Sequence, residues 1–338
     1  MLRKTPYDVT LCEIVINFIT TYLSMDMPKC MRCGGEGEVE LRYARLVLCG
    51  KCFTNYFIDR LRKTSEEYKM IRKGDKIGVY YDGSIGSVAL ADSIARAYPD
   101  HEIHIIYVDM GITYYSVDAR NPIEELAQKH GLRLHVYSLP KERGYSIEDF
   151  RKTKYWRKIC STCGVLKRYY YSYVAYREGV DVLATPHTLD DIVEILFTLF
   201  IDGKLDEIPG ISPVQEPEFP NQVRRVKPFI KTYEWEVKRY VEILELPTVG
   251  YECPLREGAR SIWRKEVLQE LEAREPAIMR KMLRVFMKKL TPLLSDKASR
   301  PELRPCKICG GPSITGVCGK CVREIYLRER KNLDIKIG

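Results

Sequence analysis

The chain contains no long uninterrupted apolar run. An apolar stretch within its first 25 residues is broken by Asp8, Glu13 and Asn17, and no small-residue cleavage site follows it. Such a stretch is too short and too interrupted to span a membrane, and it is a poor match to a secretory signal. We therefore expect a cytoplasmic protein.

Amide side chains are also scarce. Asn and Gln together number nine among 338 residues, whereas Lys and Arg number 55. This composition is typical of thermophilic proteins. The formal net charge of +9 is spread over the chain rather than gathered in one tail, which favours an anionic partner such as nucleic acid.

Cysteine, by contrast, is abundant and clustered. Of the 12 cysteines, eight form four C-x2-C pairs near the two ends of the chain, and Cys160 with Cys163 forms a fifth. This clustering indicates metal ligation in a reducing compartment rather than disulfide bonds. Two C-x2-C pairs supply the four thiolates of a closed zinc site, which stabilises a small module that has no core of its own. The predicted ligands of two Zn²⁺ ions are Cys30, Cys33, Cys49 and Cys52, and Cys306, Cys309, Cys318 and Cys321.

Short apolar strands alternate with helical stretches through the middle of the chain. Strands are predicted at 76–81, 103–109, 132–138 and 181–185, and helices at 53–74, 88–98, 123–130, 162–178 and 189–200. This alternation predicts an α/β fold with a doubly wound parallel sheet. Such sheets bind ligands at the carboxyl ends of their strands, where Asp82, Asp109 and residues 185–191 fall.

The remaining segments complete the predicted organisation. A hairpin is expected between the first two cysteine pairs, a loop over the rim of the sheet at the Pro-rich stretch 208–226, and charged helices at 232–244 and 259–290, the second interrupted near Pro276. The predicted division is an N-terminal extension with a short amphipathic helix (1–28), an N-terminal zinc module (29–53), the α/β catalytic domain (54–294) and a C-terminal zinc module (302–330).

A glycine-containing turn, residues 82–87, joins the first predicted strand of the sheet to its helix. The backbone N–H groups of such a turn, aided by the helix dipole, can bind phosphate. The pattern alone is weak evidence for a nucleotide, because many strand–helix turns contain Gly and Ser.

Cys160 and Cys163 begin a predicted helix whose next turn carries Lys167 and Arg168. Positive charge nearby lowers the pKa of a thiol, so we expect lowered values here. From the spacing alone, a redox disulfide, a zinc pair and iron–sulfur ligation are all open. Cys253 is either a core residue or a third ligand, and three cysteine ligands would leave one iron of a 4Fe–4S cluster open to exogenous sulfur.

Asp190 and Asp191 begin another predicted helix directly after a strand. Carboxylates in this position commonly cap the helix and interact favourably with its dipole. The functional alternative is Mg²⁺ ligation or proton transfer at the same edge of the sheet.

Taken in order, these motifs resemble the tRNA 2-thiouridine synthetases of the PP-loop, or N-type ATP pyrophosphatase, superfamily. The matching segments, from about Cys30 to Cys321, are the two cysteine quartets, the strand–glycine-turn–helix, Val108–Ile112 with Tyr115-Ser116, Cys160–Arg168, Leu189–Asp191, Val226–Pro228 and Glu252–Pro254. The resemblance implies an enzyme, a tRNA sulfurtransferase. In such an enzyme ATP adenylates the C2 oxygen of a tRNA uridine, and sulfur held on a three-cysteine 4Fe–4S cluster then attacks C2.

The resemblance also implies roles for individual residues and partners. The positions that match are Lys167, Asp191 and its neighbour Asp190 for catalysis, Cys160, Cys163 and Cys253 for the 4Fe–4S cluster, and Gly83, Ser84, Gly86, Ser87 and Asp109 for ATP with Mg²⁺. The implied sulfur source is a small ubiquitin-like thiocarboxylate carrier or sulfide. Relatives of this kind further imply a homodimer, and favour uridine 54 of the T loop as the target.

The phosphate turn departs from the family pattern Ser-Gly-Gly-x-Asp-Ser. Gly86 replaces the aspartate, Ser84 replaces a glycine, and Asp82 places a carboxylate where a bare anion would repel phosphate. Three hypotheses follow. Asp82 holds a Mg²⁺ that bridges to phosphate, or the chain is a non-adenylating paralogue that binds tRNA or an active subunit, or it acts on another activated substrate.

Overall fold

The computed structural model of the protein describes residues 28–151, 153–219, 221–256, 260–295 and 302–331. The chain forms two compact units, Met1–Asn55 and Tyr56–Gly338. The short amphipathic helix predicted near the start of the chain lies outside the described residues. The four-part division stays a prediction.

The first unit is built on a short hairpin. β1 (Val39–Leu41) and β2 (Leu46–Leu48) are antiparallel, with Val39 opposite Leu48. Leu41 and Leu48 are fully buried. The hairpin predicted between the two cysteine pairs is therefore confirmed.

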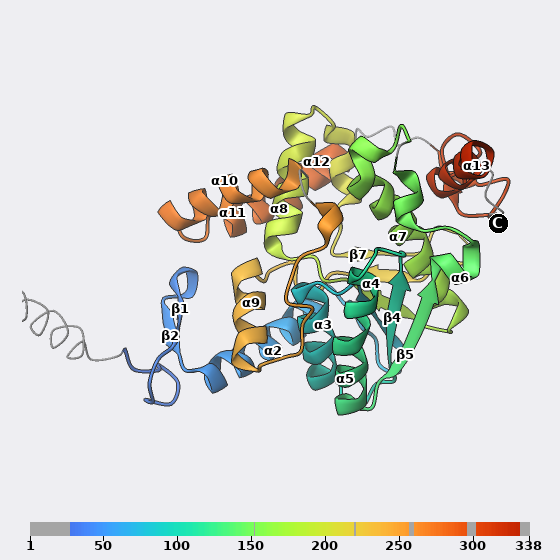
Figure 1. The fold of residues 1–338 in the computed structure, drawn as a ribbon. Helices are drawn as coiled ribbons and strands as arrows, with labels where there is room; N and C mark the ends of the chain where they lie inside the picture. Colours follow the sequence, from blue (N-terminus) through green and yellow to red (C-terminus); the bar gives the residue numbers. More distant parts are fainter. Residues whose placement is uncertain (1–27, 152, 220, 257–259, 296–301, 332–338) are drawn as a thin grey trace, which may run out of the picture. The chain divides into compact units, whose positions relative to one another are not determined.

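The second unit contains a six-stranded sheet in the order β5-β4-β3-β6-β8-β7. Its strands are β3 (Ile77–Tyr81), β4 (Ile103–Asp109), β5 (Arg133–Ser138), β6 (Val182–Ala184), β7 (Val214–Gln215) and β8 (Arg224–Val226). All neighbouring strands are parallel except β7, which is antiparallel to β8. The predicted doubly wound parallel sheet is confirmed, with one antiparallel strand added at its edge (Figure 1).

The prediction that residues 208–226 form only a loop is wrong, because β7 and β8 lie within this segment. The two strands are only two and three residues long, and β8 begins with two arginines instead of an apolar run. Arg224 nevertheless lies opposite Val182 in the sheet and is buried, because it forms an ion pair with Asp75. The partner that makes this strand possible lies far away in the sequence.

Helices connect the strands and surround the sheet. Their bounds are α2 (Gly50–Glu67), α3 (Ile85–Ala97), α4 (Tyr115–Asp118), α5 (Arg120–His130), α6 (Leu139–Arg143), α7 (Ile159–Arg177), α8 (Leu189–Ile201), α9 (Glu234–Ile243), α10 (Arg260–Arg274), α11 (Ile278–Val285), α12 (Thr291–Ser295) and α13 (Gly319–Lys331), and two short strands, β9 (Arg304–Pro305) and β10 (Pro312–Ser313), precede α13. α2 ends at Glu67 rather than near residue 74, because the backbone turns at Lys69, whose φ is 50°. The predicted interruption near Pro276 separates α10 from α11.

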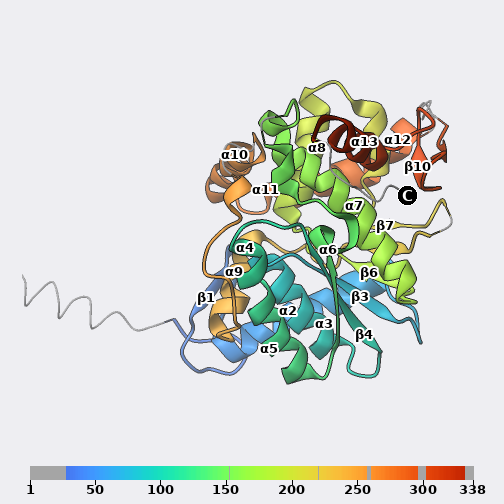
Figure 2. The ribbon, with the colours of Figure 1, turned by 45° about the vertical axis from the view of Figure 1, so that its right-hand side comes forward.

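The order of the strands places helices on both faces of the sheet. The chain moves from β3 through β4 to β5 in one direction, and then returns to β6 on the other side of β3. Because parallel crossovers are right-handed, this reversal puts α7 on the face opposite to α3 and α5. α3 packs on β3, α5 on β5 and α7 on β4, an arrangement that can be followed in Figure 2.

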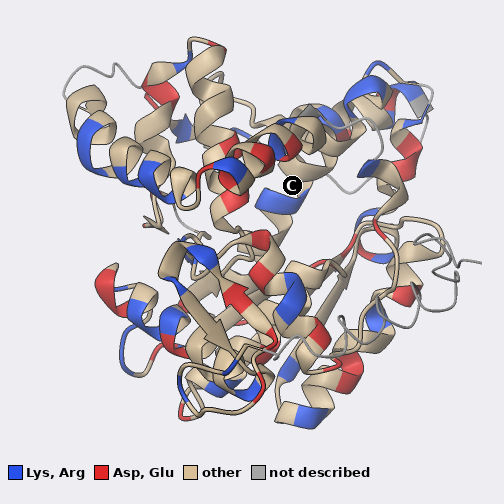
Figure 3. Ribbon diagram, turned by 90° about the vertical axis from the view of Figure 1, so that its left-hand side faces the viewer, with Lys and Arg blue, Asp and Glu red and all other residues tan. Residues whose placement is uncertain are grey.

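The helices carry basic and acidic residues side by side, as the sequence led us to expect (Figure 3). Within the described part of the chain, no helix combines the length and the apolar character that a membrane crossing needs.

A buried ionic cluster fixes α13 against α7. Glu324 of α13 is fully buried and lies 2.8 Å from Nζ of Lys320, one turn earlier. Its other oxygen accepts hydrogen bonds from Tyr145, at 2.9 Å, and from Tyr170 of α7. Arg143 lies 3.7 Å from the carboxylate. A buried carboxylate is tolerated only when it is paired and hydrogen-bonded, so this cluster determines how the C-terminal cysteine quartet sits on the sheet domain.

Replacement of Glu324 by alanine is expected to lower the free energy of unfolding by about 3–5 kcal/mol, because the buried Lys320 ammonium loses its carboxylate. Glu329→Ala removes an exposed carboxylate from the same helix and should change the value by less than about 0.5 kcal/mol. Denaturant unfolding of the full chain measures both. Equal stability of the two variants would contradict the role given to Glu324.

Candidate active site

Two turns meet at the point where the strand order reverses. β3 is followed by the turn of residues 82–87, and its neighbour β6 is followed by the turn that leads to Thr188 and α8. The onward connections of β3 and β6 run in opposite directions, which opens a crevice at the carboxyl ends of such strands. The two turns are adjacent, because a Cβ built on Gly86 would lie 3.5 Å from Cβ of Pro186.

Local hydrogen bonds shape the 82–87 turn. Ser84 is the N-cap of α3, where its Oγ accepts a hydrogen bond from N of Ser87 at 3.3 Å. Gly83 has a φ of 85°, and a Cβ there would lie only 2.8 Å from Cβ of Ala119, so this position requires glycine. Gly86 is different, because a Cβ there would meet only ordinary contacts, none closer than 3.5 Å. The N-terminus of α3 lies within this turn at the carboxyl end of β3, and the first N–H groups of a helix in that position can bind anions.

Asp82 is not a bare anion, which corrects the expectation drawn from the sequence. Nζ of Lys167 lies 2.9 Å from Oδ2 of Asp82, and each side chain is 20% exposed. The hydroxyl of Tyr80 donates to the same oxygen at 3.1 Å, and N of Ser84 donates to Oδ1 at 3.2 Å. Burial disfavours the charged form of both groups, but the attraction between the two charges outweighs this effect. Lys167 lowers the pKa of Asp82, and Asp82 raises the pKa of Lys167 well above its usual value. The turn thus holds a matched pair of charges at neutral pH.

The structure brings together the three thiols that the sequence grouped. Cys160 and Cys163 lie one turn apart at the start of α7, and Cys253 immediately precedes a 3-10 turn, Pro254–Arg256, that packs against α7. The thiol of Cys160 donates a hydrogen bond to the carbonyl oxygen of Leu255 at 2.7 Å. Leu255, which makes this contact with Cys160, is only two residues after Cys253 in the chain.

The expected lowering of the thiol pKa values is wrong. Burial raises the pKa of Cys160 and Cys253, and it raises the pKa of Cys163 to about 11. Lys167 acts in the opposite direction on all three, but burial outweighs it. These thiols are suited to binding a metal that displaces their protons rather than to acting as free thiolates.

The spacing of this cysteine triad does not fit one zinc ion. Among the described residues, three or more potential ligand atoms all lie within 4.8 Å of one another only in the two cysteine quartets. Thiolates around one zinc, with Zn–S bonds of about 2.3 Å, lie about 3.8 Å apart. A cluster in which each thiolate binds a different iron accommodates the wider triad.

Each quartet has the spacing of a tetrahedral thiolate site. The sulfur atoms of Cys33 and Cys49 are 3.6 Å apart, and those of Cys309 and Cys318 are 3.5 Å apart. The glycine after the second cysteine has a positive φ in both quartets, 76° in the first and 70° in the second. The residues therefore fit a closed four-thiolate metal site in each module.

Asp190 and Asp191 differ in their surroundings despite being adjacent. Asp190 is buried, and it accepts hydrogen bonds from N of Glu234 at 2.8 Å and from Nε2 of Gln269 at 3.0 Å. Burial raises its pKa. Asp190 thus joins the start of α8 to α9 and α10, which is the role of a positioning residue.

Asp191 remains partly accessible, with 29% of its side chain exposed, and it lies 2.5 Å from Nζ of Lys265. It also completes a capping box with Thr188. Burial opposes its ionisation, but Lys265 and then His187 lower its pKa. The sequence did not indicate Lys265, because it is one of many basic residues in a charged helix and belongs to no motif.

Asp109 lies at the carboxyl end of β4, one strand from the 82–87 turn. Its two oxygens accept hydrogen bonds from N of Gly111 at 2.7 Å and from Oγ of Ser138 at 2.9 Å. The side chain therefore shapes the rim of the crevice in this structure.

A parallel sheet with a glycine turn at its switch point, flanked by two cysteine quartets, defines a protein of the PP-loop class. The chain is 31% identical over 304 residues to the tRNA-5-methyluridine(54) 2-sulfurtransferase of Thermus thermophilus. The aligned region covers 89% of this chain and 93% of that protein. It is 30% identical over 310 residues to the protein of the same name from Pyrococcus horikoshii, with 92% and 97% covered. The chain belongs to the tRNA-5-methyluridine(54) 2-sulfurtransferase family.

The fold is also similar to a solved structure, the U34-tRNA thiolase NcsA from Methanococcus maripaludis with its 4Fe-4S cluster. The TM-score is 0.75 at 25% sequence identity, with 90% of this chain and 97% of that chain covered. No protein-family model matches the chain.

Asp190→Ala is expected to lower the free energy of unfolding by about 1–3 kcal/mol, because it leaves the buried N–H of Glu234 and the amide of Gln269 without an acceptor. Asp191→Asn keeps the oxygen that caps α8, and should change stability by less than about 1 kcal/mol. Thermal and denaturant unfolding of the two variants, side by side, separate the positioning residue from its neighbour. A larger loss for Asp191→Asn than for Asp190→Ala would reverse the assignment.

Proposed function

We propose that the chain is an ATP-dependent tRNA sulfurtransferase that replaces the C2 oxygen of a uridine with sulfur. The observation that carries this proposal is the convergence of Cys160, Cys163 and Cys253 next to Lys167, at the switch point of a PP-loop sheet. The relatives are named as tRNA 2-sulfurtransferases, and the structural neighbour is a tRNA thiolase. The net charge of +9 suits a tRNA substrate.

Cys160, Cys163 and Cys253 would hold a 4Fe–4S cluster of the kind that NcsA carries. When bound, such a cluster supplies an iron without a protein thiolate, to which exogenous sulfur can bind. The chain's own contribution is a thiol-lined position in which Cys163 is buried and Cys160 and Cys253 are half-buried. Lys167 adds a positive charge, which favours the thiolate form of all three cysteines.

The 82–87 turn and the N-terminus of α3 would bind the phosphates of ATP through backbone N–H groups. In the first step the uridine C2 oxygen attacks the α-phosphate and pyrophosphate leaves. In the second step sulfur attacks C2 and AMP leaves with the oxygen. Lys167 would offset negative charge on the phosphate, and Asp191 would bind Mg²⁺ or accept a proton, once each exchanges its present partner for substrate.

The two quartets would each bind one Zn²⁺ in a structural role. The short sulfur–sulfur distances and the similar turns support this assignment. All 11 described cysteines are free of disulfide bonds, in keeping with a cytoplasmic location, where thiols stay reduced.

Further parts of the proposal concern partners. A ubiquitin-like thiocarboxylate carrier would deliver the sulfur, and uridine 54 is the target favoured by the names of the relatives. A homodimer is supported by an exposed apolar face on α10, formed by Trp263, Val267 and Leu271 at four-residue spacing.

Cys253→Ala is expected to abolish both the cluster and the activity. Anaerobic reconstitution of the wild-type chain should give a brown protein with about four irons in the triad, and incubation with tRNA, ATP and sulfide should yield 2-thiouridine by nucleoside mass spectrometry. Cys12→Ala alters the cysteine that belongs to neither the quartets nor the triad, and should leave both results unchanged. A colourless wild-type protein, or full thiolation by Cys253→Ala, would refute the cluster proposal.

Asp82→Ser is expected to tighten Mg-ATP binding by about tenfold, because it removes a negative charge from the phosphate turn and releases Lys167 toward the phosphates. Asp59→Ser, which removes an exposed carboxylate on α2, is the control for net charge. Equilibrium binding of ATP measures both variants. Weaker binding in Asp82→Ser would mean instead that Asp82 holds Mg²⁺, and absence of saturable ATP binding in the wild-type chain would favour the non-adenylating paralogue.

A further inference from the structure

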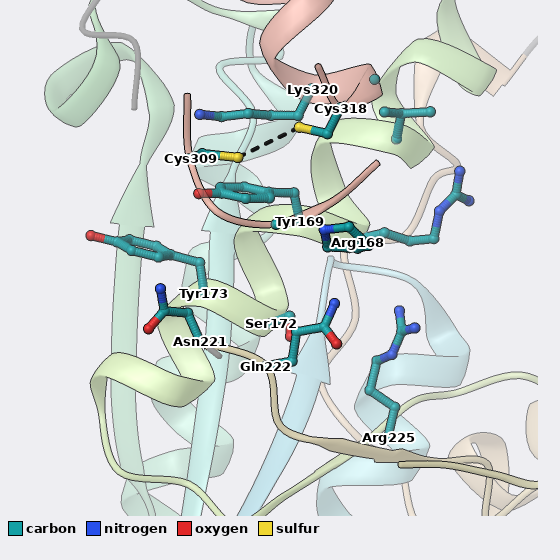
Figure 4. A pocket seen from close by; sticks show the side chains of 14 residues that line it. Arg168, Tyr169, Ser172, Tyr173, Asn221, Gln222, Arg225, Cys309, Cys318 and Lys320 are labelled. Carbon is teal, nitrogen blue, oxygen red and sulfur yellow. Dashed lines mark hydrogen bonds between the residues drawn. The ribbon is translucent and has the colours of Figure 1, made fainter. Parts of the chain in front are cut away.

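A second polar pocket lies beside the active site, where α7, the segment before β8 and the C-terminal cysteine quartet meet (Figure 4). It has a volume of about 260 Å³ and includes Arg168, Tyr169 and Tyr173 of α7, Asn221, Gln222 and Arg225. Its volume is slightly below the range of about 300–1,000 Å³ that is usual for small-molecule sites, so it suits a single nucleotide unit rather than a duplex.

Two arginines give the pocket its positive charge. Arg168 and Arg225 come from different elements, and their guanidinium groups lie on the same side of the pocket (Figure 4). Among the described residues neither side chain forms a hydrogen bond or ion pair, whereas the adjacent Arg224 is paired with Asp75. Burial and the neighbouring Arg168 lower the pKa of Arg225. Glu218 acts on Arg225 in the opposite direction, but no carboxylate of the described residues forms an ion pair with either arginine. Two cations held in this way are stabilised by a bound anion, and the planar fork of arginine matches phosphate.

The rest of the lining can contact a nucleobase. The amide oxygen of Gln222 accepts hydrogen bonds from N of Glu218 and N of Phe219, at 3.1 and 3.3 Å, which leaves its amide NH₂ as a donor. Asn221 lies beside it, so two of the nine amide side chains in the chain occur at this pocket. Amides and aromatic rings are the groups that read and stack unpaired bases in RNA.

The aromatic side of the pocket is held in place by the C-terminal module. The rings of Tyr169 and Tyr173 are nearly parallel, with 8° between their planes and 6.1 Å between their centres. Nζ of Lys320 lies 4.6 Å from the centre of the Tyr169 ring and is already paired with Glu324. Lys320 therefore orients Tyr169, and the two arginines remain to bind the anion.

The position of the pocket along α7 relates it to the reaction centre. Lys167 pairs with Asp82, and the adjacent Arg168 belongs to the face of α7 that lines the pocket, which begins at Val165. With a helix rise of about 1.5 Å per residue, Arg168 lies about 7.5 Å along the axis from Cys163. The rise alone corresponds to about two nucleotide steps of 3.4 Å along one strand, and because five residues turn the helix by about 140°, the two side chains leave it on different faces.

We propose that this pocket binds one unpaired nucleotide of the tRNA close to the target uridine, with Arg168 and Arg225 on its phosphate and the amides and tyrosines on its base. The proposal rests on the function proposed above, and it adds the place where the RNA strand beside the uridine is held. It also gives the C-terminal module a role as one wall of an RNA site.

The test is tRNA binding by the full-length chain, measured by filter binding at several salt concentrations. Arg168→Gln and Arg225→Gln are each expected to weaken binding about tenfold and the double variant about 100-fold near 0.1 M salt, with the salt slope reduced by about 0.7–1 per arginine. Arg284→Gln removes an exposed arginine on α11 and should leave affinity and slope at their wild-type values. Binding of ATP should be the same in all variants.

A second measurement identifies the nucleotide and does not depend on the arginine variants alone. In a series of tRNAs that each lack one base near the target, one member should bind the wild-type chain more weakly, and Gln222→Ala should show no further loss with that member. Thermal unfolding shows that each variant is folded, and Arg225→Lys, which keeps the charge, should bind between wild type and Arg225→Gln.

The outcomes separate this proposal from the one it rests on. If the double variant binds tRNA with the affinity and salt slope of Arg284→Gln, the pocket is not an RNA site, even when the wild-type chain makes 2-thiouridine. If the variants lose binding as expected but the wild-type chain makes no 2-thiouridine, the pocket stands and the sulfur-transfer proposal fails. If the wild-type chain does not bind tRNA, both are overturned.

Discussion

The parallel pairing of β3 with β6 is the constraint on which the site depends. It places Val79 opposite Ala184, the last residue of β6, so that β3 ends only two residues beyond the end of β6. The 82–87 turn and the turn before α8 must then face each other, because the connections leave on opposite sides of the sheet. Most residues given a chemical role act from these turns, from α7 or from the start of α8, whereas Cys253 acts from the segment that packs against α7.

The charged side chains of the crevice are paired with one another. Asp82 and Lys167 are matched, and Asp191 is matched by Lys265, so the crevice without substrate contains no uncompensated ion among these four groups. A phosphate can pair with Lys167 or Lys265 only by taking the place of the carboxylate that each lysine now contacts. The departure from the family pattern at Asp82 is therefore a change in the charge that phosphate meets, while the backbone at Gly83 keeps the geometry of a tight turn.

Much of this arrangement could be predicted from the sequence, because it depends on patterns formed by residues that are close together in the chain. β4 begins and ends at the predicted residues, and the C-x2-C spacing placed both quartets correctly. The elements that were missed depend on partners distant in the chain. β8 is a strand because it pairs with β6, Lys265 matters because α10 packs near Asp191, and Arg225 lines a pocket with residues from α7 and the C-terminal module. The thiol pKa values were misjudged for the same reason, since burial is a property of the fold and not of the neighbouring residues.

The anchoring of α13 makes the second quartet part of the main folding unit. Cys318 immediately precedes this helix and Cys321 lies in its first turn, while Glu324 one turn later is bound to Tyr145 and Tyr170 of the sheet domain. Free energy gained by ligation at these two cysteines is therefore shared with the whole domain through thermodynamic linkage. The lifetime of the enzyme in a cell would then follow the supply of the metal that fills this site.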